Sequence, residues 1–169
     1  MQINYLGQPW FQLVGQLEEY THSLNADFYW WGIKFLDKKY LMNWEWSPDL
    51  TILFEDNLIR GKLTGNVHLE PHLSDLQLEE IGFLGWTQDE SHDCDCLFSE
   101  WRLPEESGNI IAGGFNVMSS IYGVSDNAVL IGSSRDIDTI IASSQHLSYS
   151  PKYGGYCRNS KKALYEDLR

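Results

Sequence analysis

"FYWWGIKFL" occupies residues 28–36 and consists mainly of aromatic and β-branched residues, with none of the spacing of a helix. Such a run predicts a β-strand. Neighbouring side chains of a strand point to opposite faces of its sheet, so Trp30 and Trp31 cannot both enter one core. At least one of these two tryptophans is therefore expected on the face that points away from that core.

Further strand-like segments follow, with short polar turns at 37–39 and 47–49. Residues 40–46, "YLMNWEW", alternate in character and predict a strand whose one face carries four side chains, Tyr40, Met42, Trp44 and Trp46. Residues 50–57, "LTILFEDN", and 58–63, "LIRGKL", predict two more strands. Short connections between successive strands indicate an antiparallel meander.

The segment "HLSDLQLEEIGFLGW", residues 72–86, predicts a helix with unusually complete end signals. Ser74 and Gln77 have the spacing of a capping box, in which each side chain accepts from the other residue's backbone N–H. Gly85 stands where a left-handed residue would end the helix, and Trp86 would then pack back on Ile81.

The remaining segments complete an α+β pattern. Gly113 and Gly114 lie inside a helical segment and indicate close approach of another backbone. We expect one α+β domain over residues 1–147, an antiparallel β-sheet meander packed with helices, and a basic, tyrosine-containing C-terminal tail over 148–169. The further elements expected are helices at 9–24, 104–124 and 134–147, a strand at 128–134, a short extended segment at 97–103 and a short helix near the end of the tail.

The charge of the chain is acidic and uneven. The 169 residues carry a net charge of −12; the tail is net +3 and the rest is net −15. A general nucleic-acid binder needs a basic face, so that class is not expected, whereas a basic protein partner is compatible. No apolar run is long enough for a membrane helix and no leader pattern opens the chain. The tail either folds back on the acidic body or serves as an arm for a partner or a homodimer.

Residues with possible site chemistry are few. His92, Cys94 and Cys96 in "HDCDC" are potential metal ligands, but a zinc site commonly draws four ligands from two separated pairs, so no metal is expected. Cys157 follows a Gly-Gly-Tyr segment that is poorly suited to positioned nucleophilic chemistry. We expect neither catalytic residues nor a cofactor. The odd number of cysteines fits a reducing compartment, and we expect a cytoplasmic protein.

The order of these segments resembles the TY-Chap domain and the wider type III secretion chaperone-like superfamily, which includes the YbjN-type proteins. The resemblance rests on "KKYLMNWEW" before "LFEDNLI", on "LSDLQLEEIGFLGW", and on "IYGV" before an apolar strand, and covers about residues 10–132. The cysteine-containing loop, the Gly113-Gly114 pair and the basic tail depart from it. The resemblance implies an α+β fold that binds another polypeptide and does not catalyse a reaction.

From these observations we expect a non-enzymatic adaptor or chaperone-like assembly factor that captures a peptide or helix of a partner protein. Tryptophan and tyrosine are enriched among interface anchors. An acidic immunity or anti-defence protein that blocks a basic toxin or nuclease site is the alternative. The residues expected to contact the partner are Trp30, Trp31, Trp44, Trp46 and Tyr40.

Overall fold

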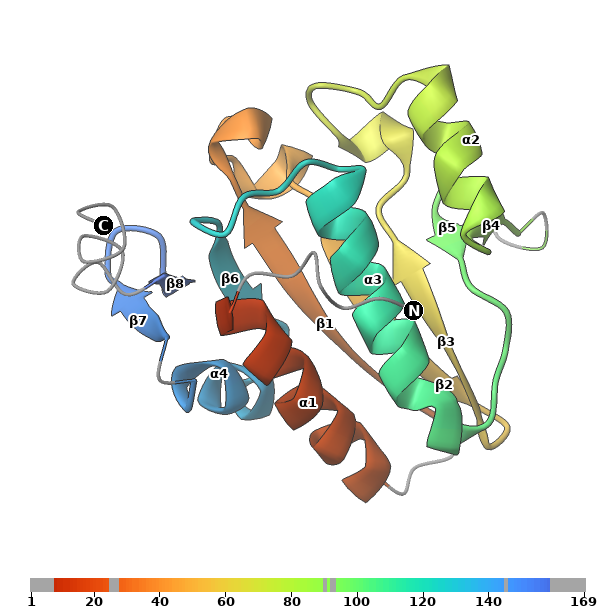
Figure 1. Ribbon diagram of the computed structural model, residues 1–169, viewed down its shortest axis with the longest axis horizontal. Helices are drawn as coiled ribbons and strands as arrows, with labels where there is room; N and C mark the ends of the chain where they lie inside the picture. The colour runs from red at the N-terminus through yellow and green to blue at the C-terminus, as the bar shows by residue number, and fades with distance from the viewer. Residues whose placement is uncertain (1–7, 25–27, 90, 92–93, 145, 159–169) are drawn as a thin grey trace.

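The computed structural model describes residues 8–24, 28–89, 91, 94–144 and 146–158. Within them the fold is α+β: helices pack against one antiparallel sheet of eight strands in the order β4-β5-β3-β2-β1-β6-β8-β7 (Figure 1). No helix of this described part is long and apolar enough to cross a membrane. The strands are β1 (Phe28–Leu36), β2 (Asp49–Glu55), β3 (Leu58–Leu63), β4 (Thr87–Gln88), β5 (Leu97–Phe98), β6 (Val129–Gly132), β7 (Leu147–Ser150) and β8 (Gly155–Arg158). The helices are α1 (Gln8–Ser23), α2 (Asp75–Phe83), α3 (Ser107–Ser120) and α4 (Arg135–Ala142).

The centre of the sheet is the meander β1-β2-β3. Its second hairpin closes through Asp56 and Asn57, whose φ angles of 50° and 63° are those of a two-residue turn matched to the twist of the strands. Asp and Asn tolerate this left-handed conformation better than most side chains. The predicted strands at 28–36, 50–57 and 58–63 are thus confirmed, with the last two residues of the second one forming the turn.

A helical layer covers one face of this sheet. Three aromatic rings of the core contact one another edge to face, with centroids 5.4–5.9 Å apart: Trp10 of α1, Phe35 of β1 and Phe115 of α3. Gly114 lets α3 approach the sheet, since a Cβ there would lie 2.6 Å from Leu50 of β2. The close approach predicted for this glycine exists, but the neighbour is a side chain and not a backbone.

Helix α2 begins and ends as its sequence predicts. The backbone N–H of Gln77 donates to Ser74 Oγ at 3.2 Å, and that of Ser74 donates to Gln77 Oε1 at 2.8 Å, which completes the capping box. Gly85 has φ +94°, and the N–H of Trp86 donates to the carbonyl of Ile81 at 3.2 Å, as in a Schellman motif. The Trp86 indole is buried, and a Cβ on Gly61 of β3 would lie 2.5 Å from it. The helix stop therefore also anchors α2 to the sheet.

The strand predicted at 40–46 is wrong. Two short 3₁₀ helices, Lys38–Tyr40 and Trp44–Trp46, occupy this segment, and Leu41 and Met42 between them have φ angles of 62° and 50°. The side chains of Asp37 and Asn43 accept hydrogen bonds from backbone N–H groups two residues later, at 2.9 and 2.8 Å. Such local bonds compete with a strand ladder, so the alternation of this segment does not mark one face of a strand.

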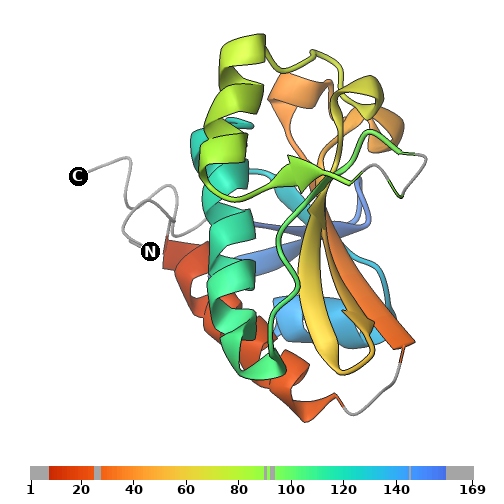
Figure 2. The same ribbon diagram turned by 90° about the vertical axis from the view of Figure 1, so that its right-hand side faces the viewer.

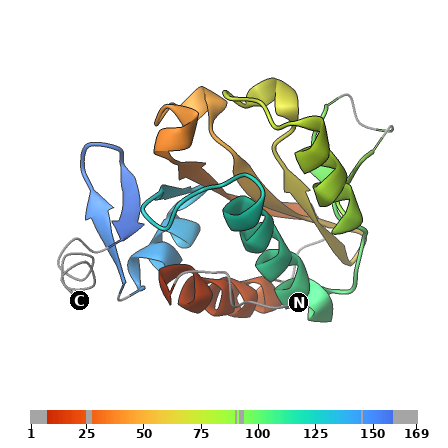
Figure 3. The ribbon, with the colours of Figure 1, turned by 45° about the horizontal axis from the view of Figure 1, so that its top comes forward.

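The first part of the basic tail belongs to the sheet. Strands β7 and β8 form a hairpin, and Tyr156 of β8 pairs with Leu130 of β6. The rings of Tyr149 and Tyr156 are 5.4 Å apart, edge to face. Figure 3 shows this hairpin at the end of the molecule remote from α2. Residues 159–169, with the predicted terminal helix, lie outside the described residues.

Candidate binding face

The sheet face opposite the helical layer is the candidate site. Figure 2 shows α1, α2 and α3 on one side of the strands; α4, which overlaps the strands in this view, packs its Ile137 against Gly132 on the core side. Among the described residues, no α-helix therefore covers β1, β2 and β3 on the other side. We call this second side the open face. Because side chains alternate along each strand, β1 directs Trp30, Gly32 and Lys34 to the open face, and Trp31, Ile33 and Phe35 to the core. The matching open-face residues of β2 and β3 are Asp49, Thr51, Leu53, Arg60 and Lys62.

A pocket of about 360 Å³ lies on the open face between two tryptophans. Trp30 is 51% exposed and Trp44, from the second 3₁₀ helix, is 54% exposed. Gly32 stands between Trp30 and Lys34 in β1, and its lack of a side chain leaves room for the hollow; Ile131 of β6 contributes apolar surface. A glycine flanked by aromatic surface can receive the apolar side chain of a ligand.

The rim of this pocket is held by a charged side chain. Lys34 Nζ lies 5.3 Å from the ring centroid of Trp44 and 3.7 Å from Asp49 Oδ2. Asp49 in turn accepts a hydrogen bond from the hydroxyl of Thr64 at 2.9 Å. This chain of contacts positions Trp44 over the sheet while leaving its ring accessible to a ligand.

The five predicted partner-binding residues do not lie together. Trp30 and Trp44 line the same pocket, and Trp46, 38% exposed, lies outside its lining. Trp31 is fully buried and its indole N–H donates to Thr21 Oγ1 at 3.1 Å. Tyr40 is also fully buried, and its hydroxyl donates to the carbonyl of Tyr122 at 2.6 Å. In the isolated chain, Trp31 and Tyr40 are therefore core residues that a partner does not reach.

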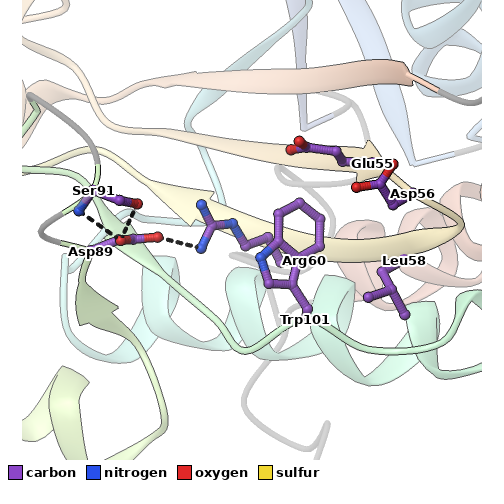
Figure 4. Close-up of a pocket in the computed structure, with 7 residues that line it drawn as sticks. All are labelled: Glu55, Asp56, Leu58, Arg60, Asp89, Ser91 and Trp101. Atoms are coloured by element: carbon purple, nitrogen blue, oxygen red, sulfur yellow. Dashed lines mark hydrogen bonds and ion pairs between the residues drawn. The ribbon is translucent and has the colours of Figure 1, made fainter.

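A second pocket, of about 290 Å³, opens at the far edge of the same face (Figure 4). Its lining is Glu55, Asp56, Leu58, Arg60, Asp89, Ser91 and Trp101. Figure 4 shows the two hairpin carboxylates, Glu55 and Asp56, on one side, the pair Asp89 and Ser91 on the other, and Arg60 with Trp101 between them. The sequence did not predict this site; its one indication is a single arginine, Arg60, at an open-face position of the strand "LIRGKL".

Arg60 is fixed in this second pocket by an ion pair and by contacts with two aromatic rings. Only 5% exposed, it donates from Nη1 to Asp89 Oδ2 at 2.9 Å, and its guanidinium carbon lies 4.1 Å from the Phe98 centroid and 4.5 Å from that of Trp101. Hydrogen bonds from Ser91, and then from Arg60, hold the pKa of Asp89 well below its usual range. The pair is therefore ionised on both sides at neutral pH, and each charge has a partner.

The two pockets are connected by strand pairing. Trp30 of β1 stands opposite Leu53 of β2, which stands opposite Arg60 of β3. These three side chains form one row across the open face, with half-buried Leu53 between the pockets. The open face therefore offers a continuous surface with an aromatic pocket at its β1 end and, at its β3 end, a pocket lined by the carboxylates of Glu55, Asp56 and Asp89.

A third hollow lies on the helical side, between α2 and α3. Its volume is about 400 Å³ and its lining is Glu80, Phe83, Leu84, Asn116, Ser120 and Ile121. Phe83 is 83% exposed, so this groove has an apolar rim. It lies on the opposite side of the molecule from Trp30 and Trp44.

The cysteine-containing loop offers little for nucleophilic chemistry. Cys94, Cys96 and Cys157 are free, and the described residues contain no group of three or more potential metal ligands. His92 lies outside the described residues. Burial, and then the neighbouring Cys94, raise the pKa of the Cys96 thiol to about 12. Cys96 is therefore a protonated thiol at neutral pH and a weak nucleophile.

Comparison with known proteins gives no relative. No protein-family model, no curated protein and no solved structure matches this chain.

Proposed function

We propose that this protein is a non-enzymatic adaptor or chaperone-like assembly factor that captures a segment of a partner protein on its open face. The observation that carries the proposal is the pocket between Trp30 and Trp44, two half-exposed tryptophans around a glycine on a sheet face without a helical cover. Free thiols in all three cysteines suit action in the reducing cytoplasm, which is part of the proposal.

The energetics favour such a use of the two tryptophans. Burying the exposed half of one indole removes roughly 100 Å² of largely apolar surface from water, which is worth about 2.5 kcal/mol before the costs of association. Two such rings around one pocket form a compact anchor site of the kind that dominates protein interfaces. The resemblance to the type III secretion chaperone-like superfamily remains a prediction and points to the same class of function.

The test uses selection of peptides on the protein itself. Random dodecapeptides displayed on phage are selected on the immobilised chain, and the affinity of the best synthetic peptide is measured by calorimetry. We expect Trp30→Ala and Trp44→Ala each to weaken binding about tenfold or more, because each removes one wall of the pocket.

Trp46→Ala is the matched control, since it removes an exposed tryptophan of the same segment that does not line the pocket. It should bind the peptide as the unaltered protein does. Equal affinity of the Trp30→Ala, Trp44→Ala and Trp46→Ala proteins, all folded by thermal melting, would contradict the site.

A second candidate function is an acidic immunity or anti-defence protein that blocks a basic toxin or nuclease site. It is favoured by the carboxylates of Glu55, Asp56 and Asp89 around one pocket of the open face. Such a protein would bind its partner with an affinity that falls steeply as salt rises. Binding carried mainly by the Trp30–Trp44 pocket would depend only weakly on salt, which separates the two functions.

A further inference from the structure

We propose that the pocket of Glu55, Asp56 and Trp101 is a subsite for an arginine side chain of the captured segment. This inference rests on the proposed function and adds the chemistry of the partner to it. It gives the partner segment two anchors: an apolar residue between Trp30 and Trp44, and a guanidinium at the β3 end of the same face.

The charges of the pocket leave room for one more cation. Arg60 and Asp89 neutralise each other through their 2.9 Å ion pair. Glu55 and Asp56 make no ion pair with any other described residue and are exposed, so the pocket has an excess of two negative charges. An incoming cation would therefore not have to displace Arg60.

The walls of the pocket suit a guanidinium in shape as well as in charge. Arg60 already occupies part of the Trp101 ring, with its guanidinium carbon 4.5 Å from the centroid, so an incoming guanidinium would contact the part of the indole that lines the pocket. A planar guanidinium can stack on an aromatic ring and donate two parallel hydrogen bonds to a carboxylate, whereas a lysine ammonium acts as a point charge. Leu58 can cover the methylene stem of the arriving side chain.

The spacing of the two anchors follows from the sheet. Trp30 lines the first pocket and Arg60 the second, and with Leu53 they stand on three adjacent strands, so the linings are two strand spacings apart, roughly 10 Å. An extended chain advances about 3.3 Å per residue, so about three residues cross this distance. The long stem of the arriving arginine covers the further distance from Arg60 to Glu55 and Asp56. The expected segment has an apolar residue and an arginine about three positions apart.

The test compares two short peptides that differ in one charge. The probes are the blocked tetrapeptide Leu-Gly-Gly-Arg and its analogue with citrulline, an uncharged isostere, in place of arginine. Binding is followed by the indole N–H resonance of Trp101, assigned with Trp101→Phe. We expect the arginine peptide to bind at least about fivefold tighter than the citrulline peptide at low salt, and the difference to shrink as salt is raised.

Glu55→Gln combined with Asp56→Asn removes the two charges and keeps the side-chain shapes. This double variant should lose the preference for arginine, while Glu79→Gln combined with Glu80→Gln, an exposed pair on α2 of equal charge change, should retain it. Equal affinity of the two peptides for the unaltered protein, or no binding of either, would overturn the inference. So would an equal loss of preference in both double variants.

The outcomes separate this inference from the proposed function. If Trp30→Ala weakens both peptides while arginine and citrulline bind alike, the Trp30–Trp44 pocket stands and the arginine subsite fails. If the preference for arginine persists while Trp30→Ala changes neither affinity, the subsite stands and the proposed anchor fails.

Discussion

Trp30 and Trp31 are neighbours in β1, yet one meets solvent and the other a closed core. Trp31 is fully buried beneath the helical layer, and its indole N–H donates a hydrogen bond to Thr21. Half of Trp30 is exposed beside a pocket on the open face. The cause is local: alternation in the strand sends them to opposite faces, and the helices cover one of these. The same residue type therefore serves stability on one face and is available for recognition on the other.

The largest expected effect on stability is that of truncating Trp31, and truncation of Trp30 is its comparison. Trp31→Ala should lower the free energy of unfolding by about 3–5 kcal/mol, because it opens a large cavity in the core and leaves Thr21 without its donor. Trp30→Ala should cost roughly 1 kcal/mol or less, because half of its ring already contacts water. Urea unfolding of both variants measures the difference; similar losses would mean that the two faces are not distinct.

Adding a methyl group at Gly61, on the face of the sheet that the helices cover, should have a smaller but clear effect on stability. In Gly61→Ala the new Cβ would lie 2.5 Å from the buried Trp86 ring, so we expect a loss of about 1–3 kcal/mol. The control is Gly15→Ala in α1, where a Cβ would meet nothing within 4 Å and should stabilise the helix by roughly 1 kcal/mol. Thermal melting of both proteins is the measurement. A neutral Gly61→Ala would show that α2 is not anchored through Trp86.

The smallest expected effect concerns the buried phenol of Tyr40. Burial, and then the carboxylate of Asp37, raise the pKa of Tyr40 above its ordinary value of about 10. A raised folded-state pKa gives a contribution to stability that is complete below about pH 10 and is lost as the pH rises further. In Tyr40→Phe we expect a loss of about 1 kcal/mol at neutral pH, from the missing bond to Tyr122, and a shallower decline above pH 10.

Urea midpoints between pH 8 and pH 11 for both proteins would measure that slope. Tyr122, whose pKa burial also raises, keeps a residual alkaline decline in the variant. An unchanged slope in Tyr40→Phe would remove Tyr40 from the explanation.

The sequence predicted well those elements whose signals are local. The α2 capping box, the helix stop at Gly85 and the strands around Asp56-Asn57 all depend on residues within a few positions of one another. The opposite directions of Trp30 and Trp31 followed from strand alternation alone. The fold class therefore follows from the chain without further information.

The predictions that failed depend on competition or on distant contacts. Side-chain caps from Asp37 and Asn43 favour two 3₁₀ helices, Lys38–Tyr40 and Trp44–Trp46, although the alternation of residues 40–46 is typical of a strand. As a result Tyr40 enters the core while Trp44 reaches the open face. The second pocket joins Arg60 of β3 to Trp101 and Asp89, which are far apart in sequence, and no local pattern marks that meeting.

The measurement that tests recognition on the open face most directly is fluorine NMR of the protein labelled with 5-fluorotryptophan. The chain has seven tryptophans, which lie on the open face, near it, or in the core, so each resonance reports on a known place. On addition of a selected peptide, the resonances of Trp30 and Trp44 should shift, while those of Trp10 and Trp31 should stay. A peptide that binds without moving Trp30 or Trp44 would contradict recognition at this face.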